Sequence, residues 1–170
     1  MPARVISGTA KGRKLKLVPG DSTRPIMDRV KEALFNILDD VGGERWLDLF
    51  AGTGQVGIEA LSRGAAEVVF VDKARAAVQT VRDNLTHTRL IEGATVVQTD
   101  ALAYLRDFAG SPFDLIYIAP PQYHDLRIGA LQAIDTAAER LLLSNGLAVV
   151  QIDPREFREL ALTNLVLDDK

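Results

Sequence analysis

The chain has 170 residues, a formal net charge of −3, two histidines and no cysteine. This length suits one domain with a full hydrophobic core. The missing cysteine excludes a thiolate nucleophile and cysteine-ligated zinc or iron–sulfur clusters, and His87 and His124 alone cannot build a metal site, so we expect none. No apolar run approaches the roughly 20 residues that cross a bilayer, and residues 1–14 lack the apolar stretch of a signal peptide, which predicts a cytoplasmic protein with no membrane association.

The N-terminal segment is basic, whereas the rest of the chain is acidic. Residues 1–31 carry a net charge of +6, which leaves −9 on the remaining residues. The spacing within 4–17 predicts a β-hairpin around a glycine-containing turn. Its cations Arg4, Lys11, Arg13 and Lys14 are candidates for binding a polyanion, although a solvated charged face is the simpler alternative.

After the hairpin, the pattern predicts a helix that Pro25 opens and Gly42-Gly43 ends. Strands and helices then alternate, as in an α/β, doubly wound and mostly parallel sheet. The expected strands are 45–50, 67–72, 94–98, 113–119 and 146–152, with a further one at 161–169. The expected helices are about 55–63, 74–85, 101–108 and 126–142. We expect one compact unit, in which 1–44 is an N-terminal extension of a 45–170 domain.

The sequence DLFAGTGQVG follows the first strand of the alternating part. Its glycines, Gly52, Gly54 and Gly57, form a G-x-G-x-x-G pattern, and Asp72 ends the next strand twenty residues after Gly52. Such glycines let the backbone approach a ligand closely, and the carboxylate accepts two ribose hydroxyls. The alternative is a purely structural turn.

An acidic residue inside the glycine-loop strand argues against a dinucleotide. Asp48 would repel a pyrophosphate but would suit a ligand with a positive charge. S-adenosylmethionine carries a ribose, an amino group and a sulfonium, and therefore fits better. Asp100 and Ala101 would flank its adenine, although Asp100 equally fits a helix N-cap. The candidate cofactor-binding residues at this edge are Asp48, Phe50, Gly52, Thr53, Gly54, Asp72, Lys73, Asp100 and Ala101.

The run APPQY, residues 119–123, ends the fourth strand of the alternating part. Prolines terminate a strand and leave a stiff corner with outward carbonyls. Carbonyls at Ala119 and Pro120 could accept hydrogens from an exocyclic amine of a base, and Tyr123 could stack on that base. Ala119, Pro120, Pro121, Gln122 and Tyr123 are therefore the candidate catalytic residues, and a simple strand terminator is the alternative.

Taken in order, RVISGTAKGRKL, TRPIMDRVKEALFNIL, WLDLFAGTGQVGIEALSRGA and FDLIYIAPPQY resemble the bacterial 16S rRNA guanine-N2 methyltransferases over residues 4–123. The resemblance implies a class I methyltransferase sheet with a last antiparallel hairpin and S-adenosylmethionine as cofactor. It also implies that Arg24, Pro25 and Arg29 line the mouth of the pocket. Where the family has Asp-Pro-Pro followed by an aromatic residue, this chain has Ala119 in place of the aspartate and Gln122 in place of the aromatic residue.

The function expected from these features is methyl transfer to the N2 amino group of a guanine in 16S rRNA. The partner would be naked rRNA or a small-subunit assembly intermediate, bound by a monomer. Three alternatives stay open: a DNA amino-group methyltransferase, an RNA-binding homologue impaired in catalysis because Ala119 replaces aspartate, and a nicotinamide oxidoreductase.

Overall fold

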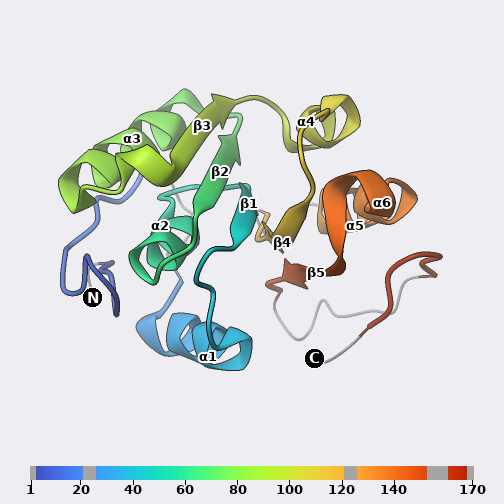
Figure 1. Ribbon diagram of the computed structural model, residues 1–170. Coiled ribbons are helices and arrows are strands. Elements are labelled where there is room, and N and C mark those ends of the chain that lie inside the picture. Colours follow the sequence, from blue (N-terminus) through green and yellow to red (C-terminus); the bar gives the residue numbers. More distant parts are fainter. Residues whose placement is uncertain (1–2, 21–25, 121–125, 153–160, 168–170) are drawn as a thin grey trace.

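The computed structural model describes residues 3–20, 26–120, 126–152 and 161–167 (Figure 1). A five-stranded sheet with the order β3-β2-β1-β4-β5 forms its centre, and every neighbouring pair of strands is parallel. The strands are β1 (Arg45–Leu49), β2 (Glu67–Asp72), β3 (Ala94–Gln98), β4 (Phe113–Ile118) and β5 (Leu142–Val150). The helices are α1 (Asp28–Leu38), α2 (Gln55–Ser62), α3 (Arg75–Thr88), α4 (Ala101–Asp107), α5 (Leu126–Thr136) and α6 (Ala138–Leu141), with a 3-10 turn η1 (Ile91–Gly93). The predicted doubly wound α/β class is confirmed.

Helices cover both faces of the sheet, as the unbroken apolar strands require. We call the face covered by α1, α2 and α3 the first face and that covered by α4, α5 and α6 the second face (Figure 1). Alternate residues of β1 divide between them, because Trp46 packs into the first core and Leu47 and Leu49 pack into the second. Phe35 of α1 stacks on Trp46 with ring centroids 5.5 Å apart.

The N-terminal segment, defined here as residues 3–20, packs against the first face. Val5 and Leu15 are buried in its core together with side chains of α2 and α3. The predicted hairpin is present: Arg4 and Lys14 form an antiparallel bridge, and backbone hydrogen bonds join Val5 to Arg13, Gly12 to Val5 and Leu15 to Ala3 at 2.8–2.9 Å. Side chains of Glu59 and Ser62 on α2 and of Asn84 on α3 also hold the segment against these helices.

The predicted bounds of three elements were wrong. Helix α1 begins at Asp28, because Met27 is still extended, and it ends at Leu38, because Asp39 takes a φ of 61°. The predicted helix 126–142 is two helices, which a turn at Ala137 separates. Strand β5 starts earlier than expected because Leu142 pairs with Phe113 across a bulge.

The expected last strand is absent from residues 161–167, the described part of 161–169. The backbone N–H groups of Thr163, Asn164 and Leu165 instead donate to the Asp135 carboxylate on α5, at 2.7–2.9 Å. Within the described residues the sheet contains no antiparallel strand, so the hairpin implied by the resemblance is not found there.

Candidate functional site

The carboxyl ends of β1, β2, β3 and β4 lie at one edge of the sheet. In the strand register, Leu49 is level with Val71 and Ile118, and Asp72 is level with Gln98. The segments that follow these strands therefore start side by side: 50–54, 72–73, 99–101 and 119–120. Those predicted cofactor-binding and catalytic residues that the structure describes therefore lie together at this edge of the sheet. Arg24, Pro25, Pro121, Gln122 and Tyr123 lie outside the described residues.

Asp72 holds the loop that follows β1, which we call the cofactor loop (residues 50–54). One of its carboxylate oxygens accepts the N–H of Gly52 and the other accepts the N–H of Ala74, both at 2.9 Å. Each oxygen keeps lone-pair capacity for a further donor, such as a ribose hydroxyl. Gly52 has a φ of 58° and a Cβ there would meet no atom within 4 Å, so the loop backbone is open to a ligand.

Asp48 lies on β1 beneath the cofactor loop and is only 2% exposed. It accepts the N–H of Gly57 at 3.2 Å. Burial raises its pKa to about 8; the Gly57 hydrogen bond opposes this shift and the nearby charge of Asp72 adds to it. A cation close to Asp48 would favour the ionised carboxylate, which agrees with the predicted preference for a positively charged ligand.

The third glycine of the motif brings α2 close to the sheet. A Cβ on Gly57 would lie 2.4 Å from the Phe70 ring of β2, so any side chain there would push helix and strand apart. This is the packing role expected of that position in the pattern.

The other predicted cofactor residues occupy different environments at this edge. Asp100 caps α4 by accepting the Ala103 N–H at 3.0 Å, so its N-cap role is confirmed. Ala101 is buried and Lys73 is exposed. Phe50 is half-buried against the second core and has a φ of 66°, an uncommon backbone conformation for such a residue.

Sequence analysis did not identify Asn84, whose side chain holds the cofactor loop against α3. Its side-chain amide donates to the carbonyl of Thr53 at 2.9 Å and to the carbonyl of Lys16, while its oxygen accepts the Lys16 N–H at 2.8 Å. Asn84 is 1% exposed. The signal was a polar residue on the apolar stripe of α3, three residues after Val81 and next to Leu85.

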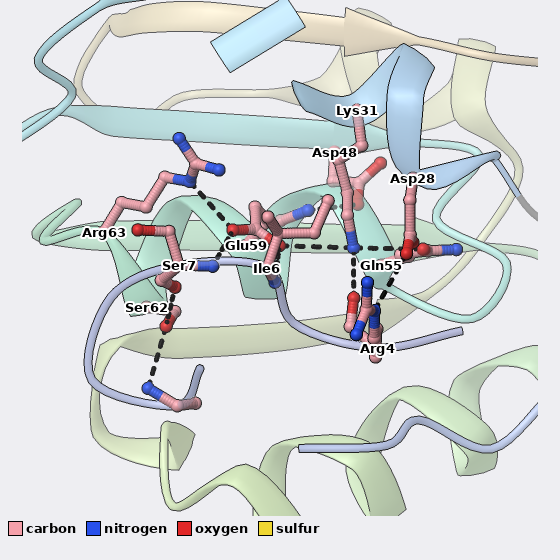
Figure 2. Close-up of polar contacts among 12 residues, drawn as sticks. Arg4, Ile6, Ser7, Asp28, Lys31, Asp48, Gln55, Glu59, Ser62 and Arg63 are labelled. Atoms are coloured by element: carbon pink, nitrogen blue, oxygen red, sulfur yellow. Dashed lines mark hydrogen bonds and ion pairs between the residues drawn. The ribbon is translucent and has the colours of Figure 1, made fainter. Parts of the chain in front are cut away.

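A buried ion pair joins α1 to α2 (Figure 2). Lys31 and Glu59 are both 0% exposed, with 3.2 Å between ammonium and carboxylate. The ammonium also donates to the Gln55 side-chain oxygen at 3.0 Å and to the Arg4 carbonyl. Burial lowers the Lys31 pKa, and the Glu59 charge partly restores it. Lys31 adds to the positive charge of residues 1–31 but is not part of an exposed basic surface.

Glu59 is the centre of this network, which we call the Glu59 network. Its carboxylate accepts the N–H of Ile6 at 2.9 Å, the N–H of Ser7 at 3.0 Å and the Arg63 guanidinium at 2.8 Å (Figure 2). One helical turn further along α2, the Ser62 hydroxyl accepts the N–H of Ala10 and donates to the Ser7 carbonyl. The N-terminal segment is therefore attached to the C-terminal half of α2, the helix that follows the cofactor loop.

The predicted polyanion-binding cations are largely at the surface. Lys11, Arg13, Lys14 and Arg29 are exposed. Arg4 is exposed too, but its guanidinium pairs with Asp28 of α1 at 2.9 Å.

At the opposite end of the edge, Ala119 and Pro120 follow β4 and are half-buried. Beneath them, Tyr117 donates a hydrogen bond to the side-chain oxygen of Gln151, which follows β5. Tyr117 is buried, and burial raises its pKa above the ordinary value. Sequence analysis did not identify Gln151, because a polar residue after a strand has no distinctive spacing.

The described residues hold no group of three or more histidine, cysteine, aspartate or glutamate side chains arranged for a metal ion. None of their helices combines the length and apolar character needed to cross a bilayer.

The sheet order, the glycine loop and the acidic residue that ends β2 together define the class I methyltransferase fold. A solved structure described as the putative methyltransferase yhhF from Escherichia coli superposes with a TM-score of 0.75 at 35% identity, over 88% of this chain and 81% of that chain. The chain belongs to the family described as conserved hypothetical protein 95, whose model matches residues 3–167.

Named relatives cover most of the chain. The putative rRNA methyltransferase YlbH of Bacillus subtilis is 42% identical over 168 residues, which is 97% of this chain and 88% of that protein. The ribosomal RNA small subunit methyltransferase D of Haemophilus influenzae is 35% identical over 154 residues, which is 88% of this chain and 78% of that protein.

Proposed function

We propose that the protein is an S-adenosylmethionine-dependent methyltransferase that modifies the N2 amino group of a guanine in 16S rRNA, in the cytoplasm. The observation that carries the proposal is the cofactor loop, held by Asp72 at the end of β2 and left open at Gly52. The similarity to rRNA methyltransferases over nearly the whole chain supports the choice of substrate.

The described residues fit this cofactor. Asp72 keeps acceptor capacity for ribose hydroxyls after its two backbone hydrogen bonds. Asp100 and Ala101 would border the adenine, and Asp48 would favour the positive end through its buried carboxylate. When bound, the cofactor supplies an activated methyl group on a positively charged sulfur.

The chain's own contribution to catalysis is mostly positioning. The carbonyls of Ala119 and Pro120 would accept hydrogens of the guanine amine and aim its lone pair at the methyl group. Gln122 and Tyr123 would complete that corner by accepting a hydrogen and stacking on the base. Since Ala119 supplies no carboxylate, backbone and amide oxygens take over the orienting role.

Residues 1–44 would form the RNA-contacting extension. Arg4, Lys11, Arg13, Lys14 and Arg29 would contact phosphates, and Arg24 and Pro25 would line the mouth of the pocket. A guanine within folded RNA would be flipped into the corner. About six phosphate contacts would give a log–log salt slope of roughly −4 on RNA.

The test is transfer of labelled methyl from S-adenosylmethionine to unmodified 16S rRNA and to the assembled small subunit, followed by nucleoside analysis. N2-methylguanosine is the expected product. Another methylated nucleoside would overturn the guanine-N2 assignment, and preference for DNA would overturn the RNA assignment. Binding of NADH in place of S-adenosylmethionine would contradict the cofactor.

The replacement of aspartate by Ala119 favours a second candidate function, an RNA-binding protein that has lost catalysis. That candidate predicts intact binding of cofactor and rRNA with no methyl transfer. It also predicts that Ala119→Asp creates activity in a protein that lacked it. If the wild-type protein is active and Ala119→Asp changes turnover by less than about twofold, the impaired candidate is excluded.

A further inference from the structure

A groove lies where the N-terminal segment meets the C-terminal half of α3. It has a volume of about 490 Å³ and is lined by Lys14, Leu15, Lys16, Asp83, Thr86 and His87. Lys14, Lys16, Thr86 and His87 are all exposed, so the lining of the groove is accessible to a ligand from solvent. Within this lining only Asp83 carries negative charge, and the Lys16 ammonium already pairs with it at 3.1 Å.

Helix α3 carries one more cation near the groove. Arg82 is exposed and lies four residues before Thr86. Residues at this spacing are neighbours on one helix face, so Arg82 shares the face of Thr86. The basic surface of the N-terminal segment therefore continues onto a helix that the charge distribution of the sequence did not single out.

Hydrogen bonds and packing fix the two walls of the groove relative to each other. The backbone of Lys16 makes two hydrogen bonds to the Asn84 side chain of α3, and Leu15 is 5% exposed in the first core. The lysines that line the groove thus project from a backbone whose position is set by α3 itself.

The groove lies on the first face, whereas the candidate catalytic corner at Ala119 and Pro120 follows β4. The groove adjoins the outer side of the cofactor loop, because the Asn84 amide donates to the carbonyls of both Lys16 and Thr53. Its residues on α3, from Asp83 to His87, lie eight to twelve residues after the helix start at Arg75, which is roughly 12–18 Å along the helix axis from the end of β2.

We propose that this groove binds the phosphate backbone of the RNA outside the nucleotide that is modified. The inference rests on the proposed function and identifies its substrate class as an extended or folded RNA. We expect a short oligonucleotide that presents only the target guanine and its neighbours to bind without the groove. Recognition in the groove would contribute affinity without touching the reacting atoms.

A matched pair of threonines tests the proposal. The Thr86 hydroxyl bonds to the Arg82 carbonyl at 3.1 Å, and the Thr136 hydroxyl of α5 bonds to the Gln132 carbonyl at 2.9 Å, so both are exposed helical threonines bonded to the residue four positions earlier. Thr86→Glu places a carboxylate in the groove. Thr136→Glu places the same charge on a helix of the second face, and is the control.

Binding is measured with unmodified 16S rRNA and with the trinucleotide ApGpA, at several salt concentrations. One lost phosphate contact is worth about fivefold in affinity at 0.1 M salt and about 0.7 in the log–log slope. We expect Thr86→Glu to weaken 16S rRNA binding at least fivefold and flatten the slope, with ApGpA binding and the cofactor Kd unchanged. Thr136→Glu should change each quantity less than twofold.

Several outcomes would overturn the inference. Equal effects of Thr86→Glu and Thr136→Glu, or no measurable binding of 16S rRNA by the wild-type protein, would reject the groove as an RNA site. Weaker binding to the assembled small subunit alone, with naked rRNA unaffected, would identify the contact as a ribosomal protein. Normal rRNA binding without methyl transfer would overturn the proposed function. The rRNA affinities of the two threonine variants would still show whether the groove binds RNA.

Discussion

The two faces of the sheet are stabilised by different chemistry. On the first face, the buried polar and charged side chains are Lys31, Asp48, Gln55, Glu59, Ser62, Thr80, Asn84 and Thr88. On the second face, Asp135 alone among the described residues is both polar and buried, and the rest of that core is aliphatic and aromatic. The first face also carries the N-terminal segment and the helix that follows the cofactor loop.

This difference shows that the elements of the first face must occupy defined positions, whereas those of the second face need only to pack closely. Apolar contacts are non-directional and tolerate small shifts, whereas a buried carboxylate is satisfied only when its donors are in place. The Glu59 network therefore sets the position of the N-terminal segment relative to α2, and with it the position of the proposed RNA surface relative to the cofactor loop.

Glu59→Gln is the substitution on the first face that we expect to lower the free energy of unfolding most. The substitution keeps the shape but leaves the buried Lys31 ammonium without its counter-charge. Uncompensated buried charges cost about 3–5 kcal/mol, so we expect a loss of about 4 kcal/mol in the free energy of unfolding, measured by urea denaturation. RNA affinity should also fall at temperatures where the variant is folded, because the Ile6 and Ser7 backbone is held less firmly.

The double variant Lys31→Met/Glu59→Gln is the control. With both charges removed, no unpaired charge stays buried, and most of the lost stability should return. A loss below about 1 kcal/mol for Glu59→Gln alone would mean that the pair behaves like an exposed ion pair, and the contrast between the faces would fail.

The second face is tested by Leu105→Ala on α4. Leu105 is 1% exposed in an apolar core, and such truncations cost about 3 kcal/mol through lost transfer energy and a residual cavity. Cofactor and RNA affinity of the folded variant should match the wild type in fluorescence or filter-binding titrations. A loss of RNA affinity at unchanged cofactor affinity would show that the second face also positions the N-terminal segment.

The strands and the cofactor loop were predictable because each depends on local signals. Continuous apolar runs mark buried parallel strands, and the G-x-G-x-x-G pattern with Asp72 marks a nucleotide-type edge. The register then brought these residues to one edge, as expected of any doubly wound sheet.

The buried polar contacts were less predictable, since their partners lie far apart in the chain. The charge count of residues 1–31 could not reveal the burial of Lys31, because composition treats every lysine alike; Lys31 shares the buried stripe of α1 with Phe35, four residues on. Glu59 is buried because all of α2 is buried, which no charge pattern reveals. Asp135 bonds to residues 28 to 30 positions later, and no local signal encodes that contact.

Asp48, on the first face, should make the free energy of unfolding depend on pH. Burial raises its pKa to about 8, whereas an unfolded aspartate titrates near about 4. Between these values the folded protein keeps a proton that the unfolded chain has released, so stability falls as pH rises. Near pH 6 to 7 the expected slope is about 1 kcal/mol per pH unit. Asp48→Asn should abolish this slope in denaturation curves measured without cofactor, and an identical slope in the variant would exclude Asp48 as its source.

The smallest effect is expected at Asp135, the polar exception of the second face. Hydrogen bonds from the backbone, that of Thr163 first, lower its pKa, and burial opposes the shift. The ionised carboxylate therefore stabilises the contact above the unfolded pKa of about 4, and this stabilisation is lost as pH falls through the lower folded value. Asp135→Asn has one oxygen for three N–H donors, so residues 163–165 should exchange their amide hydrogens faster while the sheet keeps its protection. Equal amide protection in both proteins near pH 6 would show that the contact with residues 161–167 does not depend on the charge.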